Sequence, residues 1–126
     1  MRYMTKWKAS FPKMGDENTN KILSALGLCV RAGKVVFGVP MICDAMRKGG
    51  VKSPVLVLSA ADISENTQKR ITDKCGYYKV KHIKLGCGGE TLAAALGKTS
   101  FLAAVAITDK NMSMMVEKHI NDQQIH

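Results

Sequence analysis

Apolar residues follow two patterns along this chain. Between about residues 18 and 32 they recur at helical spacing, where Leu26 and Cys29 share a face. Residues 54–58 (PVLVL) and 102–107 (LAAVAI) are instead unbroken apolar runs. Such short runs are typical of strands that are buried on both faces. The sequence therefore predicts helices that alternate with buried strands.

Turn and capping residues predict where the other elements begin and end. Gly33 ends the first helix, and Pro40 opens a second helix that runs to about Lys48. Asp62 or Ser64 caps a third helix, since Asp62 with Glu65 resembles a capping box. The third helix is predicted to end at Gly76. The remaining predicted elements are strands at 35–37 and 80–84, a glycine turn at 86–89, a helix at 90–96, and a last helix from Thr108 or Asp109 to about Ile120.

Alternating helices and strands predict an α/β fold. We expect a three-layer α-β-α sandwich, in which a four-stranded mixed sheet carries helices on both faces. Residues 1–17 show no sustained period, and we interpret them as a flexible basic N-terminal extension. Residues 18–126 then form a single domain.

Charge narrows the class of partner. The 126 residues are 46% hydrophobic and 23% charged, with a net charge of +9. Residues 18–58 hold six cations and one acid, Asp44, so this segment alone carries a net charge of +5. This concentration favours a polyanionic partner. The chain shows neither an apolar run long enough to cross a membrane nor a secretory signal, so we expect a cytoplasmic protein without a membrane partner.

Residues suited to catalysis or metal binding are scarce. The chain has three His, no Ser/His/Asp or Cys/His signature and no C-x-x-C pair. Cys29 and Cys75 fall in helical apolar patterns, where a free thiol behaves as a small hydrophobe. We therefore expect no enzyme activity, no catalytic residue, no metal and no cofactor.

The glycine turn at 86–89 leaves one alternative open, a small-ligand or nucleotide binder. A helix N-terminus after glycines offers backbone N–H groups to an anion. Here, however, Glu90-Thr91 follows Gly89 where a phosphate loop needs Lys-Ser/Thr, and the acid would repel phosphate. A turn whose glycines allow close backbone approach is the favoured interpretation.

A basic segment earlier in the chain points to RNA. Arg31, Gly33 and Lys34 form a basic turn, and Gly38-Val39-Pro40 opens the following helix. If the sheet brings these turns together, cations and backbone N–H groups would face phosphates and apolar loop tips would face unstacked bases.

The chain resembles the bacterial branch of the kink-turn-binding ribosomal protein superfamily, which includes ribosomal proteins L-seven-Ae and L-thirty-e. The resemblance covers about residues 20–120 and implies the same three-layer sandwich and an RNA partner, kink-turn-like or ribosomal, together with ribosome or ribonucleoprotein components. It rests on Leu26-Gly27-Leu28, Arg31-Ala32-Gly33-Lys34, Gly38, Leu56 to Asp62, Asn66-Thr67, Lys69, Thr72 to Cys75, Tyr78, Leu96-Gly97-Lys98 and Val105 to Asp109.

The resemblance also implies where RNA is bound. The family motif Gly-x-Asn-Glu-x-x-Lys falls on residues 38–44, where Gly38 matches and Pro40, Met41 and Asp44 stand at the other three positions. A protein-interaction module that kept the fold but lost RNA specificity is the alternative that these replacements leave open. The expected RNA-binding residues are Arg31 and Lys34 for phosphate, Gly38 and Pro40 for the turn, Met41 for apolar base contact, and also Lys48 and Leu85, the latter in an apolar loop near Gly86 and Cys87.

Overall fold

The computed structural model describes residues 16–124 of this chain. The predicted extension, residues 1–17, therefore lies almost wholly outside the described residues. The first helix begins at Asp16, two residues before the start of the helical pattern at about residue 18. Acidic residues are favoured in the first turn of a helix, and Asp16 and Glu17 stand there.

Five α-helices and four strands alternate along the described chain, as the hydrophobic pattern predicts. In chain order the elements are α1 (Asp16–Arg31), β1 (Val35–Phe37), α2 (Val39–Lys48), the short 3₁₀ helix η2 (Gly50–Lys52), β2 (Leu56–Ser59), α3 (Glu65–Tyr78), β3 (Lys81–Lys84), α4 (Gly89–Ala95), β4 (Ala104–Ile107) and α5 (Lys110–Gln124).

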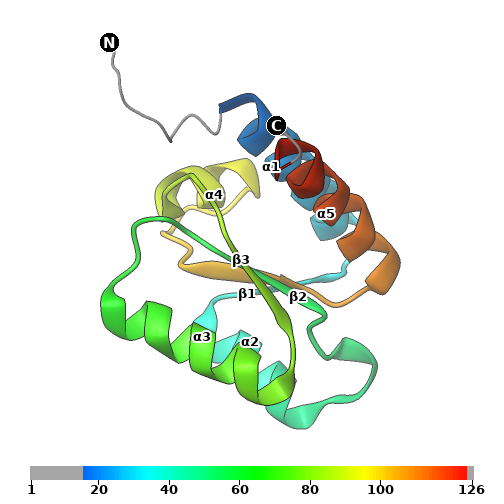
Figure 1. Ribbon diagram of the computed structural model, residues 1–126, viewed down its shortest axis with the longest axis vertical. Helices are drawn as coiled ribbons and strands as arrows, with labels where there is room; N and C mark the ends of the chain where they lie inside the picture. Colours follow the sequence, from blue (N-terminus) through cyan, green and yellow to red (C-terminus); the bar gives the residue numbers. More distant parts are fainter. Residues whose placement is uncertain (1–15, 125–126) are drawn as a thin grey trace.

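The strands form one mixed sheet with the order β1-β4-β2-β3. Strand β4 runs antiparallel to both β1 and β2, whereas β2 and β3 are parallel. Helices α1, α4 and α5 cover one face of the sheet, and α2 and α3 cover the other (Figure 1). The predicted three-layer α-β-α sandwich is confirmed.

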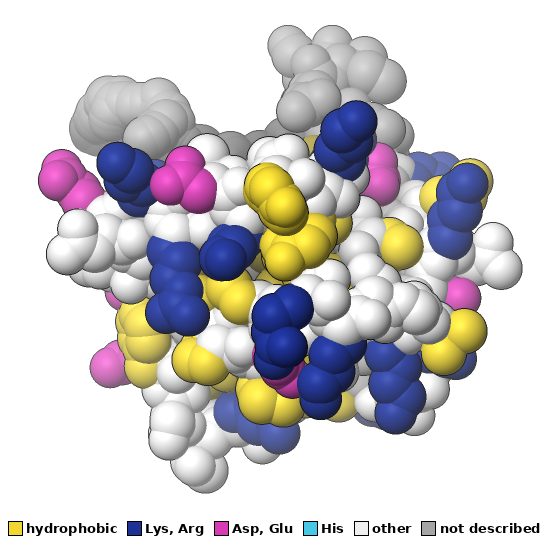
Figure 2. Space-filling view, turned by 90° about the horizontal axis from the view of Figure 1, so that it is seen from below, with side chains coloured by type: hydrophobic (Ala, Val, Ile, Leu, Met, Phe, Trp, Pro, Cys, Tyr) yellow, Lys and Arg dark blue, Asp and Glu magenta, His cyan; other side chains and the backbone are white. Residues whose placement is uncertain are grey.

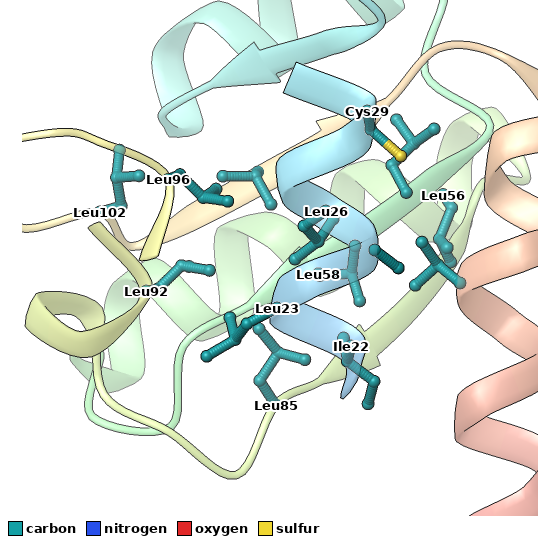
Figure 3. Packing of buried hydrophobic residues seen from close by; sticks show 14 of the residues in the cluster. Ile22, Leu23, Leu26, Cys29, Leu56, Leu58, Leu85, Leu92, Leu96 and Leu102 are labelled. Atoms are coloured by element: carbon teal, nitrogen blue, oxygen red, sulfur yellow. The ribbon is translucent and has the colours of Figure 1, made fainter. Parts of the chain in front are cut away.

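The core lies on both faces of the two central strands. Every residue of β2 and β4 is buried, as expected for strands read from unbroken apolar runs. On one face, α1 contributes Leu26 and Cys29, which are fully buried against Leu56 and Leu58 of β2 (Figure 3). On the other face Cys75 is buried, and burial, with a smaller contribution from Cys43, raises the pKa of its thiol to about 11. Cys75 is thus a neutral core residue at physiological pH.

The predicted end of the third helix was wrong, whereas one of its two predicted caps is confirmed. Gly76 does not end α3, which continues to Tyr78 and closes on Lys79 in the left-handed conformation (φ 59°). Of the two alternative caps predicted for α3, Asp62 does not serve this helix and Ser64 is confirmed. Ser64 caps this helix by accepting a hydrogen bond from the Thr67 backbone N–H at 3.2 Å.

His82 of β3 should make folding sensitive to acid. Its Nε2 lies 2.9 Å from the hydroxyl oxygen of the fully buried Ser59, and burial, with a smaller contribution from Lys84, lowers its pKa. The folded chain then binds fewer protons at His82 than the unfolded chain does. The contribution of the neutral His82 to the free energy of unfolding is therefore fully present above the unfolded pKa of about 6.5, and it is lost as the pH falls through the lower pKa of the folded state.

We expect the free energy of unfolding to decrease between about pH 7.5 and about pH 5, and to decrease less in His82→Gln. Urea unfolding of both proteins at the two pH values measures the difference. An equal decrease in both proteins would show that His82 does not carry the effect.

Candidate nucleic-acid interface

Loops from distant parts of the sequence meet at one end of the sheet. The Gly38 backbone N–H donates to the Ala104 carbonyl at 3.0 Å, and the Ala60 N–H donates to the Ala103 carbonyl at 2.8 Å. The start of α2 and the loop after β2 therefore flank the segment that enters β4. This arrangement follows from the central position of β4 between β1 and β2.

A cleft of about 350 Å³ opens between these segments, and we refer to it as the α2 cleft. The first residues of α2 form one wall, the first half of α3 forms the second, and the segment before β4 forms the third. Its lining residues are Gly38, Val39, Pro40, Thr67, Arg70, Phe101, Leu102 and Ala103.

The start of α2 exposes backbone rather than side-chain groups to the α2 cleft. Gly38 has φ 88°, a left-handed conformation that glycine adopts without steric cost. It has no side chain to cap α2, and Pro40 has no N–H. The N–H groups of Val39 and Met41 fall in the first turn of the helix, where no intrahelical acceptor exists. This turn can therefore donate hydrogen bonds to an anion or to a base edge.

The other two walls of the α2 cleft supply a cation, from α3, and an aromatic ring, from the segment before β4. Phe101 is 49% exposed although it is a large apolar residue, and Arg70 is exposed on α3. A ring of this kind can stack on an unpaired base, and a guanidinium can pair with phosphate or stack on the base itself. Met41 stands next to the cleft in sequence and is 59% exposed.

The predicted phosphate-binding residues lie at the other end of the sheet. The Lys34 carbonyl accepts a hydrogen bond from the Thr108 N–H at 2.9 Å, just after β4 ends, whereas Gly38 pairs with Ala104 where β4 begins. Lys34 and Gly38 stand four positions apart, on either side of the three-residue strand β1, which is about 13 Å at roughly 3.3 Å per residue. Arg31 and Lys34 are both exposed. The structure thus separates the predicted set into two groups.

Lys48 belongs to neither group. It lies in the last turn of α2 and forms an ion pair with Asp44 at 3.2 Å, to which Arg47 also binds. Hydrogen bonding from Lys48 is the main cause that lowers the pKa of Asp44. The acid within this helix is thus paired with cations of the next turn.

Leu85 does not contribute a side chain to a binding surface. Only 5% of it is exposed, and it packs in the core with Leu23 (Figure 3). Its backbone N–H donates to the Ser59 carbonyl at 2.8 Å, which extends the pairing of β3 with β2 by one residue. The loop beside α2 is the 97–103 segment rather than the predicted 85–87 loop, because β4 and β2 separate β1 from β3.

The glycine turn is a site of close packing. The Gly89 N–H at the start of α4 donates to the Asp62 carboxylate at 2.9 Å, so a carboxylate already occupies this helix N-terminus. A Cβ on Gly88 would overlap Asp62, and a Cβ on Gly89 would overlap the Phe101 ring. These contacts agree with the close-approach interpretation of the turn and argue against a nucleotide there.

The sequence analysis missed Phe101, Arg70 and Thr67 as residues of the cleft. The available signal was an aromatic residue in the otherwise polar stretch 97–101, just before an apolar strand. Nothing local indicated Arg70 or Thr67, which only the packing of α3 brings to the cleft. Within residues 16–124, no cluster of three or more His, Cys, Asp or Glu side chains is suited to a metal ion, and no helix is long and apolar enough to span a membrane.

Proteins of known sequence and solved structures resemble this chain. It is 40% identical over 88 residues to the RNA-binding protein YlxQ of Bacillus subtilis (strain 168), covering 70% of this chain and 83% of that protein. It is 36% identical over 72 residues to the RNA-binding protein YlxQ of Enterococcus faecium, covering 57% and 67%.

A protein of unknown function from Bacillus halodurans superposes with a TM-score of 0.71 at 29% identity, over 80% of this chain and 97% of that one. A 15.5 kD RNA-binding protein of Giardia lamblia has a TM-score of 0.69 at 14% identity, over 91% and 94%, and shares the fold. The model of the ribosomal protein L7Ae/L30e/S12e/Gadd45 family matches residues 20–117, and this chain belongs to that family.

Proposed function

We propose that this protein is a non-catalytic RNA-binding protein that uses the α2 cleft to hold an unstacked base of a bent RNA. One observation carries the proposal. The uncapped start of α2, the half-exposed Phe101 ring and the Arg70 guanidinium line a single cleft of about 350 Å³. Single-stranded and bulged RNA is recognised by this combination of donors, stacking surface and cation.

Relatives and charge support an RNA partner. Both curated relatives carry the name RNA-binding protein, and the chain has a net charge of +9. A bent RNA fits the layout of the surface, because its internal loop would enter the α2 cleft while a flanking helix reaches Arg31 and Lys34, about 13 Å away along the sheet. We propose a kink-turn-like or ribosomal RNA as the ligand, in a cytoplasmic ribonucleoprotein.

Gly38 and Pro40 contribute the shape of the cleft, whereas Met41 lines a separate cavity beside β1. Phe101 and Arg70 would supply the contacts to the RNA in place of the Asn and Glu that the family motif has at residues 40 and 41. Leu85 and Lys48 are left out, since the first is buried and the second lies at the far end of α2.

Titration with three ligands tests this proposal. A kink-turn RNA, a straight duplex of the same base composition and ATP are compared by fluorescence anisotropy and calorimetry at fixed salt. We expect the bent RNA to bind at least about tenfold tighter than the duplex and ATP not to bind. Equal affinity for both RNAs would show that a general basic surface binds RNA without recognising the bend. Saturable binding of ATP alone would contradict the proposal.

Removing the distant cations should change the salt dependence of binding. Arg31→Ala with Lys34→Ala should reduce the slope of log affinity against log salt by up to about two, one unit for each phosphate contact. Lys110→Ala with Lys118→Ala, two exposed cations of α5, is the matched control and should leave the slope unchanged. The same slope in both double variants would exclude Arg31 and Lys34 from the interface.

A further inference from the structure

The outer edge of β1 has features of a protein-docking site distinct from the α2 cleft. Strand β1 is the last strand on its side of the sheet, and within residues 16–124 no strand pairs with its outer edge. We propose that an extended, acidic peptide segment of a partner protein pairs with β1 as an additional strand. Edge addition of this kind derives its affinity from main-chain hydrogen bonds and its specificity from side-chain pockets.

The register shows which backbone groups face outward. Val36 pairs with Ala106, and the bonds from Gly38 N–H to Ala104 and from Thr108 N–H to Lys34 flank that pair. In an antiparallel ladder, residues 34, 36 and 38 therefore direct their N–H and C=O groups toward β4. The alternate residues, Val35 and Phe37, direct theirs to the free edge. These groups are available to a new strand.

A cavity beside this edge can take a side chain of the incoming strand. It has a volume of about 490 Å³ and lies between β1, α2 and η2. Val36, Met41 and Val51 supply apolar surface, and Val51 is 94% exposed while Met41 is 59% exposed. Apolar surface that remains so open is typical of interaction sites. An apolar side chain of every second peptide residue would point toward this cavity.

Cations surround the same edge on both faces of the sheet. Lys48 and Lys52 lie at the rim of the cavity, and Lys98 places its Nζ 4.1 Å from the centre of the Phe37 ring on the opposite face. Figure 2 shows Lys and Arg side chains spread over the α2 and α3 face, with apolar side chains between them. Asp44 is the one acid among the residues that line the cavity, and it is already paired.

The positive charge around the edge of β1 indicates which kind of chain can pair with this strand. A second copy of β1 would bring the lysines of both molecules together, and lysines at sheet edges are known to oppose such self-pairing. Residues 1–15 of this chain contain four cations and no acid, so they do not complement the edge. An acidic segment of another protein does complement it, because its carboxylates would meet Lys98 on one face while its apolar residues fill the cavity on the other.

Hydrogen exchange distinguishes strand addition from simple charge attraction. The probe is a synthetic peptide of about eight residues that alternates Glu and Val, the usual length of a strand. We expect it to slow exchange of the Val35 and Phe37 amides, whereas the Val36 amide is already protected. A peptide with Lys in place of Glu, and one N-methylated at alternate residues, should not bind. Binding without protection of Val35 and Phe37, or equal binding of the N-methylated peptide, would overturn the proposal.

A charge reversal tests the cations. Lys98→Glu, on the face where the peptide carboxylates would lie, should weaken binding of the Glu/Val peptide about tenfold, while Lys118→Glu on α5 should not. The same variants are then titrated with kink-turn RNA. If the Lys98 reversal weakens RNA binding and the peptide does not bind the parent protein, this lysine serves RNA and the docking site is refuted. If the protein does not bind the bent RNA, the Glu/Val peptide is still expected to bind β1, so the two proposals can be refuted separately.

Discussion

Phe101→Ala should weaken binding of the bent RNA by about 1–3 kcal/mol, roughly tenfold to hundredfold, because it removes the aromatic ring that residues 16–124 contribute to the α2 cleft. The base would lose its stacking surface while the backbone donors at the start of α2 stay in place. Phe101→Trp should retain most of the affinity, since a larger ring stacks at least as well. Anisotropy titrations at fixed salt measure both changes.

A matched aromatic control separates the cleft from the rest of the surface. Tyr77 is 78% exposed at the end of α3 and does not line the cleft, so Tyr77→Ala should leave RNA affinity within about twofold of the parent value. Arg70→Ala should weaken binding as Phe101→Ala does and should also lower the salt slope by about one. Equal losses in Phe101→Ala and Tyr77→Ala would show that the cleft does not hold the base.

The fold was largely predictable because its main signals are local. The runs that became β2 and β4 are apolar throughout, which is what burial between two helix layers requires. The predicted cap Asp109 is confirmed, because its carboxylate accepts from the Met112 N–H at 3.1 Å. Gly76 misled the prediction of a helix end, because a glycine inside a helix carries only a modest cost that the packing of α3 outweighs.

The binding site was less predictable because it depends on strand order. Arg31 and Lys34 are close in sequence to Gly38, yet the strand between them places the two groups at opposite ends of the sheet. Phe101 is 63 residues from Gly38, and the two share a cleft only because β4 inserts between β1 and β2. Leu85 follows a strand and precedes a glycine turn. In the sequence, this position is equally compatible with an exposed side chain at a loop tip and with a buried side chain in the core.

The same order explains why the glycine turn is not a phosphate site. Because β2 and β3 are parallel neighbours, the loops after both strands leave the same end of the sheet. Asp62 from the first loop therefore reaches the helix start in the second, where it fills the place of an anion. The Phe101 ring lies against Gly89 at the same helix start, whereas Asp62 lies against Gly88. The turn thus contributes to the α2 cleft indirectly, by supporting the ring that lines it.

Gly89→Ala should test this support, because its added Cβ would overlap the Phe101 ring. The ring is half exposed and can move toward solvent, which relieves the overlap at the expense of its packing. We expect the free energy of unfolding to fall by about 1 kcal/mol, the lower end of what overpacking costs. RNA affinity should fall about as much as in Phe101→Ala, although Gly89 itself does not line the cleft.

Gly76→Ala is the matched control, since it lies in a helix with open space around the new Cβ. It should raise the free energy of unfolding by about 0.5–1 kcal/mol and leave RNA affinity unchanged. A double variant of Gly89→Ala with Phe101→Ala should bind RNA no more weakly than Phe101→Ala alone, because both changes remove the same ring from the cleft. Additive losses in that double variant would contradict the link between the glycine turn and base stacking.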